Sequence, residues 1–445
     1  MTMRTNLIRK GDIRPMTLMR NLSFVLSLGL VLNYCTPESE NSEAGLLAAL
    51  ALAGSAPNQS AFLETYSQIA FQNYSDAYTD VVALRQKVAT FTAKASPSLT
   101  ELNEIKTYWR KARRSYLQTE IFRFSQGPID NPALTGGVEL EPLMNAWPLD
   151  EGYIDTVILT NPITKQGLID ANEGDCSGGT CPDGDTAKNI SVGWHAIEYL
   201  LWGADAANNF TPGNTITQTN FTTANGAGNA AAKRSAYLLY ATEILEAHLL
   251  QLKNAWDPSL SNSYVNKFKS SPTSFENVLR GIAKFAGGEW GGERMTGVFG
   301  GEQEEEHSCF SDNTKADFYF DAKGLDNLFN GSYSGSQTIT GYGLKNLLGK
   351  ETSYINERIG TAELFCLNEF TEDVSLNQAC NSSIISSRFD RMIATVNVSG
   401  SATENADYNI FRYQIQPAVQ EIAKAMQRAA ASYGVSIGDD GLVLE

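Results

Sequence analysis

The spacing of apolar residues is the feature that most restricts the fold of this chain. Over residues 62–95 and 102–124, apolar side chains recur at intervals of three and four rather than two, which is typical of amphipathic helices. Ser98 and Glu101 have the spacing of a capping box at a helix start. The same spacing runs through Leu238, Ala241, Leu245, His248 and Leu252, and through Ile415, Val419, Ile422, Met426 and Ala429. Helices with one apolar face pack into bundles. No segment shows sustained alternation of β-branched residues, so the sequence predicts an all-α fold.

The chain is long enough for two domains, and turn residues near its middle indicate where they divide. Its length is 445 residues, more than one domain usually needs. Trp256-Asp257-Pro258, followed by a Ser- and Asn-rich segment, is typical of a boundary. We therefore expect one helical bundle over residues 61–256 and a second over residues 257–445. The Asn-, Thr- and Gly-rich stretch 203–228 is predicted to be a long surface loop.

The N-terminus has the pattern of an export signal. An apolar run from Leu22 to Leu32 is too short to span a bilayer as a helix and has the length of a signal-peptide core. Residues 1–35 are therefore predicted to be a signal peptide. The basic residues that precede the apolar run are Arg4, Arg9, Lys10, Arg14 and Arg20.

The end of this signal indicates lipidation. Leu32 stands three positions before Cys35, as in a bacterial lipobox, although Asn33 and Tyr34 replace the usual small residues. We expect a lipid anchor on Cys35, and a flexible tether over residues 36–60, which are rich in Ser, Glu, Ala and Gly. The protein would then be an exported bacterial outer-membrane lipoprotein that faces the periplasm or the cell surface. Simple secretion, with an incidental thiol at Cys35, is the alternative.

Charge and cysteine usage narrow the function classes. The chain has 34 Lys and Arg against 50 Asp and Glu, a net charge of −16, which argues against nucleic-acid binding because phosphate contacts need clustered basic residues. Cys176 with Cys181, and Cys366 with Cys380, suit local disulfides in an exported protein. Metal ligation by the first pair is the alternative. With only 3 His in the chain, a metal site must be completed by carboxylates.

One predicted helix face mixes charged and large aromatic side chains. A solvated face would not carry so many aromatic residues, so this face is a candidate functional surface. A structural ion pair, such as Arg113 with Glu120, is an equally good interpretation. The residues of this face are Trp109, Arg113, Tyr116, Glu120 and Arg123.

The sharpest short motif is GWHAIE at residues 193–198. On a helix, His195 and Glu198 are three residues apart and lie on one face within about 5–6 Å at Cβ, close enough to share a metal ion or a proton. Gly193 permits close approach of another backbone. A hydrogen-bonded core histidine is the alternative. The motif is not that of a zinc peptidase, because no second histidine stands four residues from His195.

A second concentration of polar residues contains Arg294 and the segment from Gln303 to Thr314. Glu304 and His307 are three residues apart, as in the Glu-x-x-His motif of carboxylate-rich metal bundles, and Asp312 follows. A solvated acidic loop is the alternative. We interpret His248, which lies in an apolar stripe, as structural.

These motifs together resemble those of the imelysin family, also known as insulin-cleaving membrane proteases or iron-regulated proteins. GWHAIE matches the family's Gly-x-His-x-x-Glu signature. The resemblance extends from about residue 60 to the C-terminus, because further blocks resemble family blocks in the family order. These blocks are YWRKARRSYLQTEIFRF, AWPLDEGYID, GGERM and EEEHSCFSDNT.

The resemblance implies two bundle-like helical domains with a polar site between them, in exported proteins linked to iron acquisition. It assigns His195 and Glu198 to that site. From the other matching blocks we infer that Glu120 and His307 complete the metal ligands. The remaining residues that we expect to line the site are Gly193, Arg113, Arg294 and Asp312.

We therefore expect capture of a divalent metal ion, Fe or Zn, for iron acquisition, with the membrane and an iron-uptake or surface component as partners. The first alternative is an imelysin-type metallopeptidase with His195 and Glu198 as catalytic residues, which the missing HExxH motif disfavours. The second alternative is a surface receptor that binds haem or a host protein through the 203–228 loop.

Overall fold

Helices dominate the part of the chain that the structure describes, so the all-α prediction is confirmed. The N-terminal half contains α3 (Pro57–Thr92), α4 (Leu99–Leu117), α5 (Glu151–Thr160), α6 (Lys165–Asp170), α7 (Gly193–Trp202) and α8 (Ala230–Trp256). The computed structural model describes residues 57–160, 163–172, 188–205, 211–224, 226, 228–300, 306–368, 380, 383–394 and 400–439. The predictions for the leader, for Cys35, for Cys176 and Cys181 and for Glu304 fall outside these residues.

The C-terminal half is built from shorter helices. These are α9 (Tyr264–Ser270), α10 (Ser274–Lys284), the π-helix η5 (Phe285–Arg294), α11 (Met295–Gly297), α12 (Thr314–Asn330), α13 (Thr352–Ala362), α14 (Phe389–Ile393), α15 (Ala402–Ile410), the π-helix η13 (Phe411–Ile415) and α16 (Gln416–Ala431). Single turns of 3₁₀-helix lie at Glu120–Phe122, Pro132–Leu134, Gln218–Phe221, Val298–Gly300, Cys309–Ser311, Leu344–Asn346 and Gly349–Glu351.

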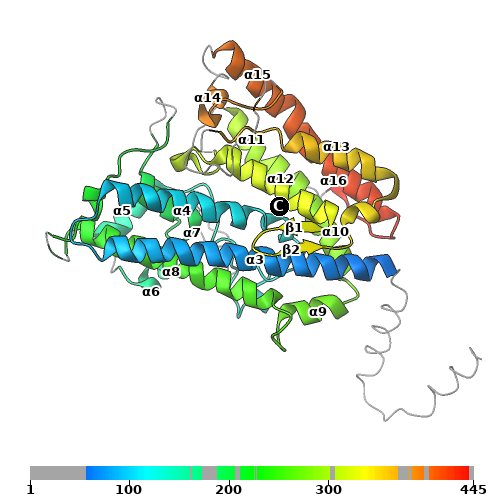
Figure 1. Cartoon of the computed structure of the whole chain (residues 1–445), viewed down its shortest axis with the longest axis horizontal. Helices are drawn as coiled ribbons and strands as arrows, with labels where there is room; N and C mark the ends of the chain where they lie inside the picture. Colours follow the sequence, from blue (N-terminus) through cyan, green and yellow to red (C-terminus); the bar gives the residue numbers. More distant parts are fainter. Residues whose placement is uncertain are drawn as a thin grey trace, which may run out of the picture. The chain divides into compact units, whose positions relative to one another are not determined.

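Two groups of helices pack around a shared core. In the first group, α3 lies between α4 and α8, and α7 packs on α8 and α4 (Figure 1). In the second group, α16 packs against α10, α13 and the π-helix 285–294. Helix α12 contacts α4 of the first group and α13 of the second. The described residues belong to one compact unit that runs from Ser55 to Glu445. The division at residue 256 into two domains stays a prediction.

The sequence located the long helices well but misplaced two of their ends. Helix α3 begins at Pro57, inside the predicted tether, where a proline fits because the first amides of a helix have no partner within the helix. Helix α4 ends at Leu117, whereas the apolar spacing predicted a helix to residue 124. Thr119 ends it, because its backbone N and its Oγ1 both donate to the carbonyl of Tyr116, at 2.7 and 2.6 Å.

Local signals at other helices are confirmed. Ser98 and Glu101 form the predicted capping box at the start of α4, with the amide of Ser98 donating to Glu101 Oε2 at 3.0 Å. The predicted apolar stripe of α8 is buried at Leu238, Ala241, Leu245 and Leu252. His248 was predicted to belong to this stripe, but it is only half-buried. The neighbouring Leu249 is fully buried instead.

A small β-hairpin is a feature of the described fold that the sequence did not predict. Strand β1 (Ser332–Ser334) pairs antiparallel with β2 (Thr338–Thr340), with Tyr333 opposite Ile339. Three residues are too few to show an alternating pattern in a sequence. The hairpin is held to α3 by Asp76, whose Oδ2 accepts hydrogen bonds from Tyr333 Oη at 2.8 Å and from the Ser336 amide at 3.1 Å.

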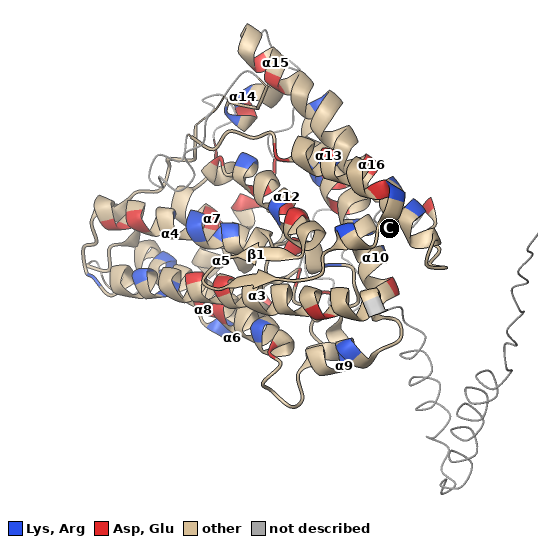
Figure 2. Ribbon diagram, turned by 45° about the vertical axis from the view of Figure 1, so that its right-hand side comes forward, with Lys and Arg blue, Asp and Glu red and all other residues tan. Residues whose placement is uncertain are grey.

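Acidic and basic residues are interspersed along the same helices in both groups (Figure 2). Within the described residues, no helix combines the length and the apolar character that crossing a membrane requires.

Candidate functional site

A fully buried arginine lies at the centre of the site. Arg113, on α4, is 0% exposed, and its Nη2 lies 2.9 Å from Asp317 Oδ2, 3.3 Å from His195 Nε2 and 3.2 Å from His307 Nδ1. Its Nη1 donates to Asn145 Oδ1 at 2.5 Å. Three of the residues singled out from the sequence, Arg113, His195 and His307, therefore meet here. We call this group, with Asp317 and Asn145, the arginine centre.

The His195–Glu198 pair forms as the spacing of three predicts. Both residues lie on α7, and His195 Nδ1 is 2.9 Å from Glu198 Oε2. Because arginine has only donors, Nε2 of His195 must accept from Arg113, so the ring proton sits on Nδ1 and faces Glu198. The other oxygen of Glu198, Oε1, accepts from the amide of Ser311 at 2.9 Å and from Ser311 Oγ at 2.7 Å. Both carboxylate oxygens of Glu198 are engaged.

Close packing at the start of α7 positions this pair. Gly193 has a φ of +89°, and a Cβ at this position would lie 2.5 Å from the carbonyl oxygen of Met144. The amide of Trp194 donates to that same carbonyl at 2.7 Å. The predicted close approach at Gly193 is therefore present, and it sets the 144–147 segment against α7. Trp147 consequently packs on the His195 ring, with 4.6 Å between the ring centroids.

Burial keeps both histidines neutral. The pKa of His195 is lowered well below 6.5 by burial, by the positive charge of Arg113 and by His307. The pKa of His307 is lowered to about 4 by burial and by Arg294, although Asp317 opposes the shift. The two rings meet edge to face with 4.7 Å between their centroids. Neutral imidazole is the form that binds metal ions.

The pKa values of the two carboxylates beside the histidines, Glu198 and Asp317, shift in opposite directions. Burial raises the pKa of Glu198 to about 8, despite its hydrogen bonds from Ser311 and the charge of Arg113. Burial would also raise the pKa of Asp317, but Arg113 and His307 together hold it below its usual value. The permanent negative charge opposite Arg113 is therefore on Asp317, a residue that the sequence analysis did not select. Only its position one turn into α12, after the family-like block, could have pointed to it.

Glu120 and Arg294 lie in a neighbouring ion-pair network rather than beside His195. Glu120 Oε2 accepts a short hydrogen bond from Arg294, which also contacts Asp321 at 3.2 Å and Glu289 at 2.7 Å. Asn145 links this network to the arginine centre, because its Nδ2 lies 3.4 Å from Glu120 Oε2. The pair suggested by the sequence, Arg113 with Glu120, is not formed. The predicted ligand Glu120 therefore contacts the centre only through Asn145.

Asp312, predicted to line the same site, faces a different group of residues. Its Oδ2 accepts from Arg388 Nη1 at 2.6 Å, and burial with neighbouring Asp390 and Asp205 raises its pKa to about 8. Asp205, Asp312 and Asp390 each offer one oxygen, all within 4.8 Å of one another. Within the described part of the chain, no other set of three or more His, Cys, Asp or Glu places its ligand atoms so close together. The predicted ligands His195, Glu198, Glu120 and His307 do not form such a set.

Two further predictions concern the Cys366–Cys380 pair and the long loop. A disulfide joins Cys366 to Cys380, whose Cα atoms lie 5.7 Å apart. Cys309 is a buried free thiol. In the described part of the 203–228 loop, Phe221 is buried against Phe91 of α3, and the Thr223 amide donates to the Ala95 carbonyl at 3.1 Å. This part of the loop is therefore fastened to the end of α3.

The fold and the site define an all-α protein with a buried arginine–histidine–carboxylate centre between packed helices. Residues 70–362 match the family model described as Imelysin, and the chain belongs to the imelysin family. The expected family resemblance is thereby confirmed.

A solved structure shows the same fold. A protein described as an iron-regulated protein A precursor from Parabacteroides distasonis matches with a TM-score of 0.56 and 17% identity, over 84% of this chain and 97% of that one. An imelysin-like protein from Psychrobacter arcticus matches with a TM-score of 0.47 and 13% identity, over 86% of this chain and 98% of that one. The comparison with curated proteins found no match.

Proposed function

We propose that this imelysin-family protein is an exported, lipid-anchored protein that binds a divalent metal ion at the arginine centre and serves iron acquisition. The observation that carries the proposal is the pair of neutral histidines, His195 and His307, each with a carboxylate on Nδ1. Ligating histidines commonly hold their other ring nitrogen against a carboxylate in this way. The iron context is supported by the description of the Parabacteroides neighbour as an iron-regulated protein A precursor.

The donor set suits iron or zinc, both of which accept imidazole and carboxylate ligands. We propose His195 and His307 as the ligands, with Asp317 as the carboxylate that orients the His307 ring through Nδ1. Glu198 then orients the His195 ring, because both of its oxygens are engaged with His195 and Ser311. Arg113 is the competing cation, since its Nη2 already occupies the lone pair of His195 Nε2. Binding at that nitrogen requires the guanidinium to leave it.

Ion capture is better supported than peptide hydrolysis. A metallopeptidase needs a carboxylate with an oxygen free to accept a proton from metal-bound water. Glu198 has both oxygens engaged, and Glu120, although its Oε1 has no hydrogen-bond partner, is paired with Arg294 in the neighbouring ion-pair network. Glu198 is therefore not available as a general base in this arrangement, and the unpartnered oxygen of Glu120 belongs to the ion-pair network rather than to the arginine centre.

Calorimetry on the full-length protein tests the proposal. We expect the wild type to bind Fe²⁺ under anaerobic conditions, or Zn²⁺, and His195→Ala to weaken binding by at least about 10-fold, the scale seen when metal-site residues are removed. His248→Ala is the matched control, because His248 lies half-buried on α8 away from the centre. Equal binding by the wild type and His195→Ala, or no binding of either ion by the wild type, would refute the proposal.

A further inference from the structure

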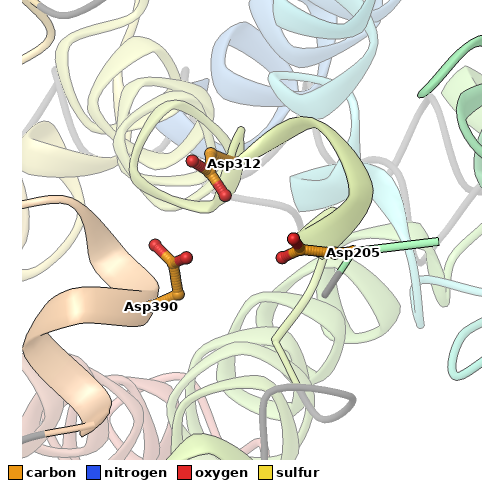
Figure 3. A group of neighbouring side chains, drawn as sticks. All are labelled: Asp205, Asp312 and Asp390. Atoms are coloured by element: carbon orange, nitrogen blue, oxygen red, sulfur yellow. The ribbon is translucent and has the colours of Figure 1, made fainter. Parts of the chain in front are cut away.

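A second polar group lies beside the arginine centre and contains only carboxylates. Asp205 follows the end of α7, Asp312 follows the 3₁₀ turn Cys309–Ser311, and Asp390 lies in α14. One oxygen from each lies within 4.8 Å of the other two. Figure 3 shows the three side chains pointing toward a common point from three segments of the chain.

A buried fourth carboxylate points to a ligand at this place. Glu306 is 0% exposed, its Oε1 accepts from Thr314 Oγ1 at 2.6 Å, and its Oε2 has no hydrogen-bond partner. The negative charges of Asp390, Asp312 and Asp205 all act on it. The Oδ1 atom of Asp312, a residue 7% exposed, is also without a partner. A buried oxygen without a donor is costly, and a bound cation removes that cost.

Arg388 and Lys315 are basic residues that act on these carboxylates. Arg388 pairs with Asp312 Oδ2, and its side chain is 44% exposed. Lys315 acts on Asp390 electrostatically while its Nζ lies 3.3 Å from the carbonyl of Ser386. Four carboxylates gathered at one place favour a divalent cation.

We propose that Asp205, Asp312, Asp390 and Glu306, named here the acidic cluster, bind one Ca²⁺ ion. Oxygen-only ligand sets select hard cations over zinc or ferrous iron. Calcium binds oxygens at about 2.3–2.6 Å, so oxygens on opposite sides of the ion lie about 4.6–5.2 Å apart, a span that accommodates the observed limit. Magnesium holds its ligands at about 2.0–2.1 Å and demands a stricter octahedron.

Calcium at this position would bind three segments that lie far apart in the sequence. The segment from Glu306 to Asp312 also carries His307 and Ser311, which face the arginine centre. The ion therefore fastens the segment that supplies His307 to the end of α7 and to α14. Its role is to hold the arginine centre in shape, which is distinct from binding iron.

Titration of the chelator-treated, full-length protein with CaCl₂ tests this inference. We expect one Ca²⁺ per chain with a dissociation constant below about 1 mM, weaker heat with MgCl₂, and a higher melting temperature in Ca²⁺ than in EGTA. Asp390→Asn should weaken Ca²⁺ binding at least about 10-fold. Asp155→Asn, which alters a half-exposed carboxylate on α5, is the matched control and should bind as the wild type does.

The outcomes separate calcium binding from a hydrogen-bonded cluster and from the iron site. In EGTA, Asp390→Asn should melt no lower than the wild type, because it removes a repelling charge; a lower melting temperature would overturn the inference. The inference would also be overturned if the wild-type protein had the same melting temperature in Ca²⁺ and in EGTA and gave no heat with CaCl₂. This outcome does not depend on whether the variant folds. His195→Ala should retain Ca²⁺ binding, so failure of the iron proposal leaves this result unaffected.

Discussion

The arginine centre is almost fully buried and the acidic cluster largely so, yet their charges are balanced very differently. One short segment serves both: His307 and Ser311 face the centre, whereas Glu306 and Asp312 face the cluster. In the centre, all three guanidinium nitrogens of Arg113 contact acceptors. In the cluster, one oxygen of Glu306, Oε2, and one oxygen of Asp312, Oδ1, have no hydrogen-bond donor.

This difference shows why burial alone does not identify a ligand site. A buried charge that is matched and hydrogen-bonded holds the fold together, whereas buried charge of one sign needs an ion or protons from outside. The centre can therefore exist without a ligand, and any ion that enters it must displace Arg113. In the acidic cluster, the unpartnered oxygens of Glu306 and Asp312 can accept an added cation. The following predictions, from the largest effect to the smallest, test this contrast.

Arg113→Met should produce the largest loss of stability. The substitution leaves Asp317 buried without its partner, at a cost of about 3–5 kcal/mol in the free energy of unfolding. Urea denaturation in the presence of a chelator measures it. Arg280→Met is the control, because Arg280 pairs with Glu276 on the surface, where ion pairs contribute about 0–1 kcal/mol. If Arg113→Met costs no more than this control, the centre is not held by its matched charges.

Gly193→Ala should have an intermediate effect. The left-handed backbone and the short approach to the Met144 carbonyl make a Cβ costly there, by about 1–3 kcal/mol. Gly360→Ala is the matched control, because its Cβ would meet no atom within 4 Å and the position lies inside α13. We expect Gly360→Ala to be neutral or to stabilise the protein by up to about 1 kcal/mol. Thermal unfolding of both variants compares them, and equal melting temperatures would contradict the packing argument at α7.

Acidification should destabilise the centre through His307 by a graded amount, at most about 1.4 kcal/mol in the free energy of unfolding for each unit of pH. The pKa of His307 is lowered from 6.5 to about 4 in the folded protein, so the unfolded chain takes up a proton first as the pH falls. Stability is therefore lost progressively as the pH falls from about 6.5 toward about 4. Urea denaturation at several pH values within this window, with chelator present, measures the slope.

His307→Gln should reduce that slope, since glutamine does not titrate. His248→Gln is the control and should leave the slope as in the wild type. An unchanged slope in His307→Gln would mean that other groups cause the acid sensitivity.

Sequence reasoning succeeded where the determinants are local. The capping box at Ser98 and Glu101 and the approach of His195 to Glu198 depend on residues three apart on one helix, so their geometry follows from the helix itself. It was wrong about the end of α4, because apolar spacing continued past Thr119, whose hydroxyl stops the helix. The hairpin at residues 332–340 was missed because its strands are too short to show a pattern.

The sequence by itself determined the all-α class, the helices that carry the site and the residue types available to it. It also brought Arg113, His195 and His307 to attention through their neighbours in the chain. Only the tertiary structure decided which charge meets which. Asp317 rather than Glu120 faces Arg113, and Asp312 meets Asp205 and Asp390 rather than His195. Partners between distant segments depend on how helices pack, and helical periodicity specifies which face is buried but not the face that it meets.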